Sequence, residues 1–277
     1  MTKSKVITYA ILFILLASRI EINTVTFISG SFSNTNVIPV WFNWLSRSAL
    51  VADGIYEIFS VPLIIIVIWL NRDDLHSLNV DNLFIFILIY TGLAVLIDSY
   101  ELGSSLGMTA ALFTVLLVGF PSGISMLFFT IYLVRKNKLN FGDPNPKVWR
   151  LSLIVIGIFI VFFIGLSDFF NIQKIQQTIS LFFLKTIPDV VYEEMIYRGL
   201  LWMFLKDLNW SQSKIFFFTG ILFWFSHLDH LPDTPVDFWI FIPVLSLLLG
   251  FLVLRSKSIT PSIIAHSLVN GLINIMQ

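Results

Sequence analysis

Long apolar stretches recur along this 277-residue chain, and they constrain its fold more than any other feature. A hydrocarbon core about 30 Å thick needs roughly 20 mostly apolar residues to cross it as an α-helix. Nine stretches are candidates for such spans: 6–20, 50–70, 83–98, 110–134, 151–167, 178–205, 214–229, 236–254 and 259–276. We therefore predict an all-α fold, a polytopic membrane helix bundle of about eight to nine transmembrane helices.

The composition excludes several other classes of protein. Hydrophobic residues make up 57% of the chain and charged residues only 12%, whereas soluble domains carry about 25% charged residues. The 17 basic and 17 acidic residues balance, so no basic surface is available for nucleic acid. Because the chain has no cysteine, disulfides, thiolate metal sites and a cysteine nucleophile are also excluded.

The first apolar stretch has two interpretations. Lys3 and Lys5 before 6–20 resemble the start of a signal peptide, but no small-x-small cleavage site precedes Arg19. We therefore expect an uncleaved span, which makes nine spans in total. The alternative is eight spans, with the first stretch lying in the membrane interface.

Basic residues predict the orientation, because short cytoplasmic loops carry the excess of Lys and Arg. They crowd the loop 135–150, and Lys206 with Lys214, and Arg255 with Lys257, fall in later loops an even number of crossings away. We expect all three loops in the cytoplasm, which places the N-terminus inside and the C-terminus outside. The many Ile, Phe, Asn and Lys residues are typical of an AT-rich genome and favour a bacterial cell membrane.

The loop 135–150 also divides the chain, since Gly142, Pro144 and Pro146 break helical structure there. We predict variable transmembrane helices over 1–170. The second part, 178–277, contains all the polar groups that look like a site.

Four charged residues lie in the part of the sixth apolar stretch that covers residues 188–204: Asp189, Glu193, Glu194 and Arg198. Each costs about 2.5 to 3.5 kcal/mol at the centre of a span, so partners or water are required. Glu194 and Arg198 are four residues apart, in the order that favours an ion pair along one helix face. Glu193 is rotated by about 100° from Glu194 and is therefore the stronger candidate for function. The alternative is that the cluster only stabilises helix packing.

Two later stretches supply further polar groups. Phe223 precedes His227 by four residues, so the aromatic ring can pack against the imidazole. In the last stretch Ser262, His266, Asn270 and Asn274 recur every four positions and form one polar stripe. The stripe either hydrogen-bonds between helices or points His266 and Asn270 into a cavity, where they could stabilise an oxyanion. Together with Glu193, these groups could activate a water molecule inside a membrane.

Three motifs in this order resemble the CPBP family of CAAX-protease and bacteriocin-processing intramembrane endopeptidases, also called Abi or type II CAAX prenyl endopeptidases. They are EExxxR at Glu193 to Arg198, FxxxH at Phe223 to His227, and HxxxN at His266 to Asn270. The resemblance covers about residues 178–277. It implies hydrolysis of a peptide bond in or near the bilayer, with membrane lipid and a peptide or membrane-protein substrate as partners and with no nucleic acid.

The resemblance also implies roles for these residues. Glu193 would activate water with the help of His227, and Glu194 with Arg198 would support the site. His266 and Asn270 would stabilise the oxyanion. Proteins of this family are often described as metalloproteases, and a metal-free glutamate mechanism has also been argued, so the cofactor stays open. Glu193, His227 and His266 are candidate zinc ligands, although no HExxH motif is present.

Two other functions remain open at the level of the sequence. The chain could be a non-catalytic membrane scaffold, an immunity protein or a regulator of the same fold. A transporter is less expected, because transporters have interrupted helices in corresponding halves, whereas the polar groups here are confined to the last third.

Overall fold

The computed structural model describes residues 3–32, 40–70, 81–104, 123–124, 126–128, 130–131, 146–165, 179 and 181–276. Every regular element in these ranges is an α-helix or a π-helical turn, so the predicted all-α class is confirmed. The predicted stretch 110–134 lies largely outside the described residues, as does most of the loop 135–150.

The elements overlap the predicted stretches. Three helices precede the dividing loop: α1 (Lys3–Phe32), α2 (Val40–Leu70) and α3 (Asn82–Ser104). Helix α6 (Pro146–Gly165) follows it. However, α2 begins at Val40 instead of near residue 50, and α6 begins at Pro146, inside the predicted loop 135–150, because proline fits the first turn of a helix. The C-terminal part consists of η4 (Phe182–Thr186), α8 (Ile187–Glu194), η5 (Met195–Leu200), α9 (Leu201–Asp207), α10 (Gln212–Phe225), α11 (His230–Asp233), η6 (Asp237–Phe241), α12 (Ile242–Ser256) and α13 (Thr260–Met276), where η denotes a π-helical turn.

The first helix is longer than predicted. It continues to Phe32, whereas the sequence predicts its end near residue 20, where Arg19 and Glu21 interrupt the apolar run. The difference has a physical reason, because Arg19 forms an ion pair inside the protein. A charge that is paired in the interior does not have to mark the end of a span.

The number of spans is not confirmed. Within the described ranges two helical segments, Lys5–Ser29 and Asp237–Ser256, are long and apolar enough to cross a bilayer, and Leu83–Ile97 is a shorter apolar helix. The other C-terminal segments fall short for two reasons. The 14-residue α10 and the 17-residue α13 are shorter than the roughly 20 residues that a span needs, and the stretch 178–205 contains several charges.

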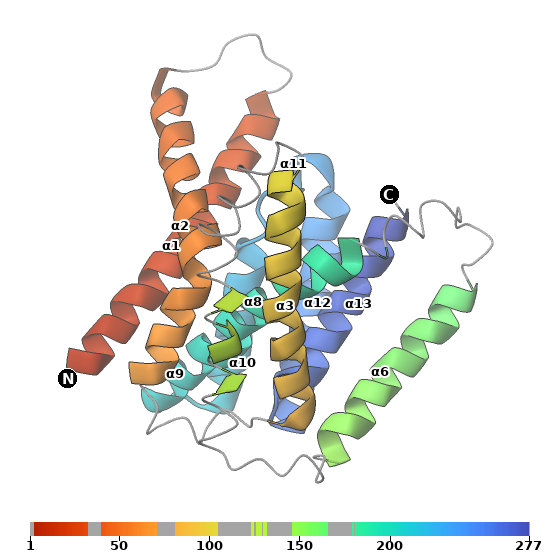
Figure 1. Ribbon diagram of the computed structural model, residues 1–277. Coiled ribbons are helices and arrows are strands. Elements are labelled where there is room, and N and C mark those ends of the chain that lie inside the picture. The colour runs from red at the N-terminus through yellow and green to blue at the C-terminus, as the bar shows by residue number, and fades with distance from the viewer. Residues whose placement is uncertain are drawn as a thin grey trace.

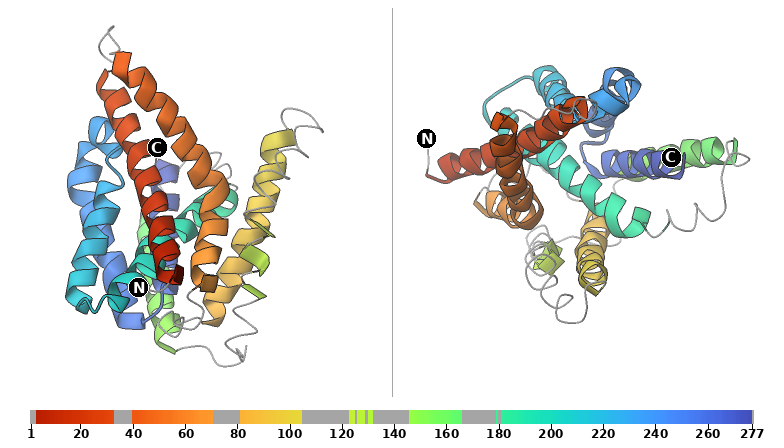
Figure 2. Two further views of the ribbon diagram at one scale, coloured as in Figure 1. Left: turned by 90° about the vertical axis from the view of Figure 1, so that its left-hand side faces the viewer. Right: turned by 90° about the horizontal axis from the view of Figure 1, so that it is seen from above.

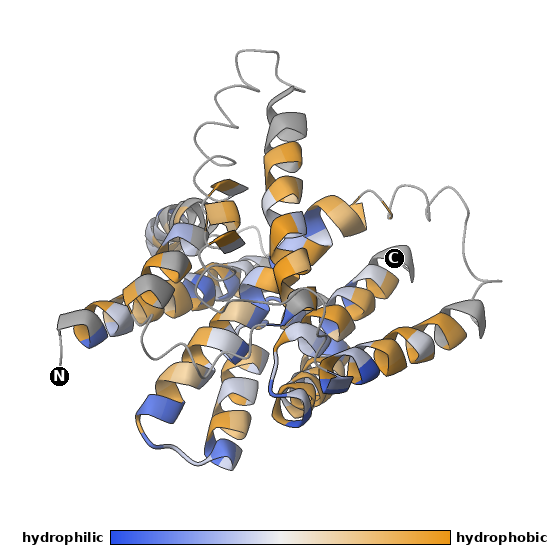
Figure 3. Cartoon of the chain, turned by 60° about the horizontal axis from the view of Figure 1, so that its bottom comes forward, coloured by the Kyte–Doolittle hydropathy of each residue, from blue (hydrophilic) through white to orange (hydrophobic). Residues whose placement is uncertain are grey.

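Large apolar side chains cover the outside of the bundle. On α6, for example, Leu153, Ile158 and Val161 are 59 to 71% exposed, and Figure 3 shows hydrophobic residues along the outer helices. Contiguous apolar surface of this kind is unfavourable in water and favourable in lipid. The exposed surface therefore fits a membrane-embedded protein.

One continuous helical segment, residues 181–207, runs obliquely through the bundle (Figures 1 and 2). It contacts α2, α3, α10 and α13, while α1 and α2 pair beside it, α10 packs on α12, and α6 lies against α13. This segment comprises η4, α8, η5 and α9, and every junction between them keeps right-handed helical backbone.

Two π-helical turns flank the glutamate pair on this segment. In η4 the Ile187 N–H donates to the Phe182 carbonyl, just before Pro188, which has no N–H to donate. The second turn, η5, begins directly after Glu194 and contains Arg198. Single π-helical turns inside α-helices often occur at functional sites.

A buried carboxylate fixes the start of α13. Asp81 accepts hydrogen bonds from the Phe84 N–H at the start of α3 (2.9 Å), from the Ser258 hydroxyl (2.6 Å) and from the Thr260 hydroxyl (2.9 Å). Thus one side chain connects the beginning of α3 to the turn between α12 and α13. The position of α13 matters because this helix carries His266.

Candidate functional site

Glu194 lies at the centre of a buried hydrogen-bond network. Arg198 Nη1 donates to its Oε1 at 3.0 Å, His266 Nδ1 lies 3.0 Å from the same oxygen, and Ser262 donates to Oε2. The ion pair predicted from the four-residue spacing of Glu194 and Arg198 is therefore present. Ser262 and His266 lie one turn apart on α13, so part of the predicted polar stripe faces this carboxylate.

Arg198 is buried as completely as its partner, with 2% exposure against 0% for Glu194. Its Nη2 donates to the Ser246 hydroxyl on α12 at 3.1 Å, and its guanidinium lies 4.0 Å from the centre of the Phe223 ring. A buried ion pair is tolerated only when additional hydrogen bonds satisfy both partners. Ser246, Ser262 and the aromatic face provide those contacts here.

Glu193 belongs to a different set of contacts. Its Oε1 accepts a 2.8 Å hydrogen bond from Nη2 of Arg19, which lies on α1 and precedes it by 174 residues. Helical spacing did not predict this partner of Glu193, and Arg19 entered the predictions only as the residue before which no cleavage site lies. The signal that could have found it is the isolated arginine inside an otherwise apolar helix, because such a charge requires a partner.

The second oxygen of Glu193 faces two histidines. Oε2 lies 3.9 Å from Nε2 of His227 and 3.9 Å from Nε2 of His266. Both distances are too long for direct hydrogen bonds. A water molecule that bridges Oε2 and one of these nitrogens, about 2.8 Å from each, would be within hydrogen-bond range of both.

Hydrogen bonds on the opposite ring nitrogens orient both imidazoles. His227 Nδ1 lies 2.8 Å from the Phe223 carbonyl oxygen, and His266 Nδ1 lies 3.0 Å from Glu194 Oε1. Because carbonyl and carboxylate oxygens only accept, each Nδ1 carries a hydrogen. A neutral ring therefore carries a lone pair on Nε2 toward Glu193, whereas a protonated ring would carry an Nε2–H donor there.

The ring of Phe223 packs against the two imidazoles of the site and against the Arg198 guanidinium. Its ring centre lies 4.5 Å from that of His227 and 5.4 Å from those of His266 and Tyr197, and the side chain is 1% exposed. The contact between Phe223 and His227 that the sequence predicts is present. This ring keeps both imidazoles in place and excludes water from behind them.

The remaining candidates lie at the margin of the site. Asn270 is half-buried one turn after His266 on α13, and the side chain of Asn274 lies outside the described residues. Asp189 is exposed in the first turn of α8. The ring centre of His230 lies 5.9 Å from that of His227, and its Nδ1 is 3.3 Å from the Thr234 hydroxyl.

The three candidate zinc ligands do not fit a metal ion in this arrangement. Two imidazole nitrogens and a carboxylate oxygen are suitable donors, but tetrahedral zinc with bonds of about 2.0 to 2.2 Å holds its ligand atoms only about 3.3 to 3.6 Å apart. Glu193 Oε2 is 3.9 Å from both nitrogens, and Arg19 bonds its other oxygen. Within the described part of the chain, no group of three His, Asp or Glu residues could hold a metal ion.

A comparison with protein families gives one match. Residues 175–272 match the family described as Type II CAAX prenyl endopeptidase Rce1-like, which confirms the predicted resemblance for the C-terminal third. The match supports a membrane-embedded enzyme of the CAAX-protease type, and it includes Glu193, His227 and His266. No curated protein and no solved structure matches the chain.

Proposed function

We propose that this chain is an intramembrane endopeptidase in which Glu193 activates a water molecule for attack on a peptide bond. One observation carries the proposal: the free oxygen of Glu193 lies 3.9 Å from the Nε2 atoms of both His227 and His266. A carboxylate held beside two oriented imidazoles in a largely apolar bundle is the arrangement that general base catalysis requires. The family match supports the same class of enzyme.

In the proposed reaction Glu193 Oε2 removes a proton from the water as the water oxygen bonds to the carbonyl carbon of the substrate. His227 orients that water through its Nε2 lone pair, since its Nδ1 hydrogen is held by the Phe223 carbonyl. When the C–N bond breaks, the proton passes from Glu193 to the leaving amine, and the carboxylate is regenerated. Arg19 holds Oε1, which leaves Oε2 as the oxygen that faces the histidines.

His266 and Asn270 stabilise the oxyanion in this proposal. The Nδ1–H of His266 remains hydrogen-bonded to Glu194. When the imidazole of His266 is protonated, its Nε2–H can donate a hydrogen bond to the substrate oxygen. Asn270, one turn further along α13, supplies a side-chain amide from the same helix. Preorganised donors of this kind contribute about 10²- to 10³-fold to the rate of acyl transfer.

The family description, which names a CAAX prenyl endopeptidase, supports a prenylated CAAX peptide as the proposed substrate class. A farnesylated CAAX peptide presented in lipid is therefore the first substrate to test.

We further propose that residues 178–277 form the catalytic core and that residues 1–170 are variable helices around it. We also propose that the protein resides in a bacterial cell membrane with its N-terminus in the cytoplasm. Arg19 makes α1 a part of the site.

An N-terminal proteomic comparison would identify the substrate. Membranes that contain the wild-type protein would be compared with membranes that contain Glu193→Gln, with Asp189→Asn as the control because it makes the same change at an exposed position of the same helix. The proposal expects new N-termini in the wild-type and Asp189→Asn samples that are missing with Glu193→Gln. Identical sets of termini in all three samples would favour the non-catalytic alternative.

Metal analysis would distinguish the two routes of water activation that the sequence leaves open. Active purified protein would be analysed for bound metal, and its cleavage would be measured with and without a chelator. Retained cleavage in protein without stoichiometric metal would support activation by Glu193 alone. Loss of cleavage with the chelator, and its return on addition of Zn²⁺, would require the side chains of Glu193, His227 and His266 to move closer together than they are here.

A further inference from the structure

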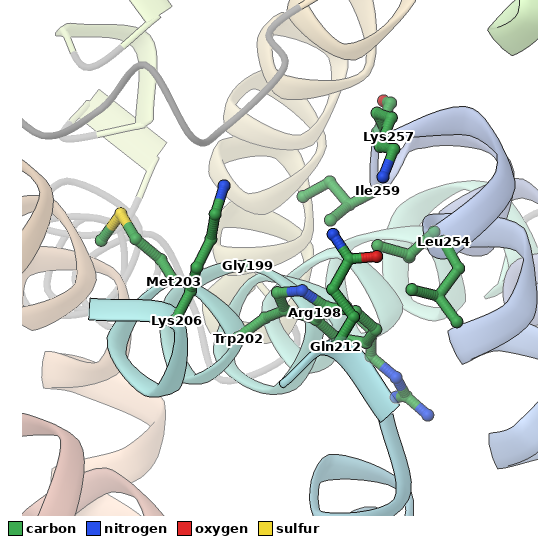
Figure 4. Close-up of a pocket in the computed structure, with 11 residues that line it drawn as sticks. Arg198, Gly199, Trp202, Met203, Lys206, Gln212, Leu254, Lys257 and Ile259 are labelled. Carbon is green, nitrogen blue, oxygen red and sulfur yellow. The ribbon is translucent and has the colours of Figure 1, made fainter. Parts of the chain in front are cut away.

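A small pocket of about 110 Å³ lies where α9, the start of α10 and the turn after α12 meet (Figure 4). None of Glu193, His227 and His266 lines it, so it is separate from the proposed catalytic centre. The two loops that supply its basic residues are both predicted to be cytoplasmic. Their meeting at one pocket shows that they lie at the same end of the bundle.

Two lysines and an amide of this pocket carry donors that could bind an anion, beside Arg198, Trp202 and Ser258, which also line it. Lys206 comes from the end of α9, Lys257 from the residue after α12, and Gln212 from the first turn of α10. In Figure 4 their side-chain nitrogens lie around one space, whereas the Arg198 guanidinium points away from both lysines toward the interior. Among the residues that the structure describes, no acidic residue lines the pocket.

The backbone at Lys257 is a second and independent observation. This residue has φ 60° and ψ 21°, the left-handed conformation that usually belongs to glycine at the end of a helix. Among the described residues other than glycine, only Asn209 shares a positive φ. Non-glycine residues in the left-handed conformation cluster at functional sites and ligand clamps, because the strain of the backbone is kept there for a function.

The surroundings favour a ligand that is partly lipid. The walls of the pocket include Met203, Leu254 and Ile259, and the adjoining Leu208 and Trp210 are 45% and 37% exposed. Tryptophan is enriched at the membrane interface, and basic pockets between helices on the cytoplasmic side bind anionic headgroups. We propose that this pocket binds the phosphate of an anionic phospholipid headgroup.

Binding of short-chain phosphatidylglycerol to the purified full chain in a neutral detergent would test this proposal. Phosphatidylcholine of the same chain length serves as the neutral lipid and inorganic phosphate as the free anion. We expect saturable binding of phosphatidylglycerol, at least about tenfold tighter than that of either comparison ligand. Equal affinity for inorganic phosphate and phosphatidylglycerol would overturn the lipid source, and non-saturable binding would overturn the site.

Matched double variants separate the pocket from the general charge of this end of the bundle. Lys206→Gln with Lys257→Gln removes both pocket lysines, whereas Lys214→Gln on α10 with Arg255→Gln on α12 removes the same charge close by in the sequence, at residues that do not line the pocket. We expect the first pair to weaken binding by about tenfold or more and the second by less than about twofold. Equal losses in both pairs would contradict the proposal.

Two single variants keep the test independent of folding. Lys257→Gly suits the left-handed backbone, so thermal stability should be maintained or should rise while lipid affinity falls. Gln212→Ala removes a hydrogen-bond donor without changing the charge, and it should weaken binding several-fold. Unchanged affinity in both variants would show that the pocket does not hold the headgroup.

Discussion

Arg19 on α1 donates a 2.8 Å hydrogen bond to Glu193 on α8, across 174 residues of sequence. The pair joins the first helix to the helix that carries the glutamate motif. It also determines which carboxylate oxygen faces the two histidines, because Arg19 holds Oε1 and the imidazoles face Oε2. In this account the N-terminal helix therefore contributes to the site and does not only surround it.

Replacing Arg19 tests this contribution. Arg19→Gln should lower the cleavage rate by about tenfold to a hundredfold, since Glu193 loses the contact that orients it. It should also lower the free energy of unfolding by about 1 to 3 kcal/mol, because a partly buried carboxylate loses its partner. Cleavage assays and thermal unfolding in detergent measure the two effects.

A conservative variant and a double-mutant cycle serve as controls for Arg19. Arg19→Lys keeps the charge and should recover part of the activity, which a purely structural role would not explain. The stability losses of Arg19→Gln and Glu193→Gln should be less than additive in the double variant. Wild-type cleavage by Arg19→Gln would show that α1 plays no part in the site.

Glu194 should be more important for stability than Glu193. Glu194→Gln leaves the Arg198 guanidinium buried without a carboxylate, which should lower the free energy of unfolding by about 3 to 5 kcal/mol. His266 also loses the acceptor that orients its ring, so activity should fall as well. Chemical unfolding of this variant beside Asp189→Asn, on the same helix, provides the measurement. A stable and active Glu194→Gln protein would refute the supporting role.

Asp81 should affect the site from a distance. Asp81→Ala removes the acceptor for the Phe84 N–H and for the hydroxyls of Ser258 and Thr260. Unsatisfied buried donors cost about 1 to 3 kcal/mol each before relaxation, so a net loss of about 2 to 4 kcal/mol is expected. Hydrogen exchange should show faster opening at the start of α13. Thr260→Val removes only one of these hydrogen bonds and should have a smaller effect.

Close packing of two helical segments predicts a difference between two glycines. A Cβ atom at Gly123 would lie 2.7 Å from the backbone oxygen of Gly92, which cannot rotate away, whereas nothing lies within 4 Å of a Cβ at Gly157. Gly123→Ala should therefore destabilise the protein by about 1 to 3 kcal/mol, and Gly157→Ala should not. Similar unfolding temperatures for the two variants would show that α3 and the segment around Gly123 are not in close contact.

Local spacing in the sequence predicted much of this site, because residues four apart on a helix are neighbours whatever the fold. The Glu194 pair with Arg198 and the contact of Phe223 with His227 are of this kind. Part of the predicted polar stripe on α13 also faces the site, since the side chains of Ser262 and His266 both contact Glu194.

Contacts between distant helices could not be predicted in this way. Periodicity gives the face on which a side chain lies but not the helix that faces it, so Arg19 was assigned no partner and the first helix was predicted too short. The link from Asp81 to the turn before α13 was missed for the same reason. The number of spans was uncertain because paired charges inside a bundle interrupt the apolar runs by which spans are recognised.

The central claim is that Glu193 activates the attacking water. Its most direct test is the single-turnover cleavage rate of a lipid-presented peptide by purified Glu193→Gln, measured beside wild type and Asp189→Asn, with equal folding shown by thermal unfolding. We expect a loss of about 10²- to 10⁴-fold in Glu193→Gln, the range that general base catalysis contributes, and a rate close to wild type in Asp189→Asn. Cleavage by Glu193→Gln at the wild-type rate would contradict the role of Glu193 as the base that activates the water.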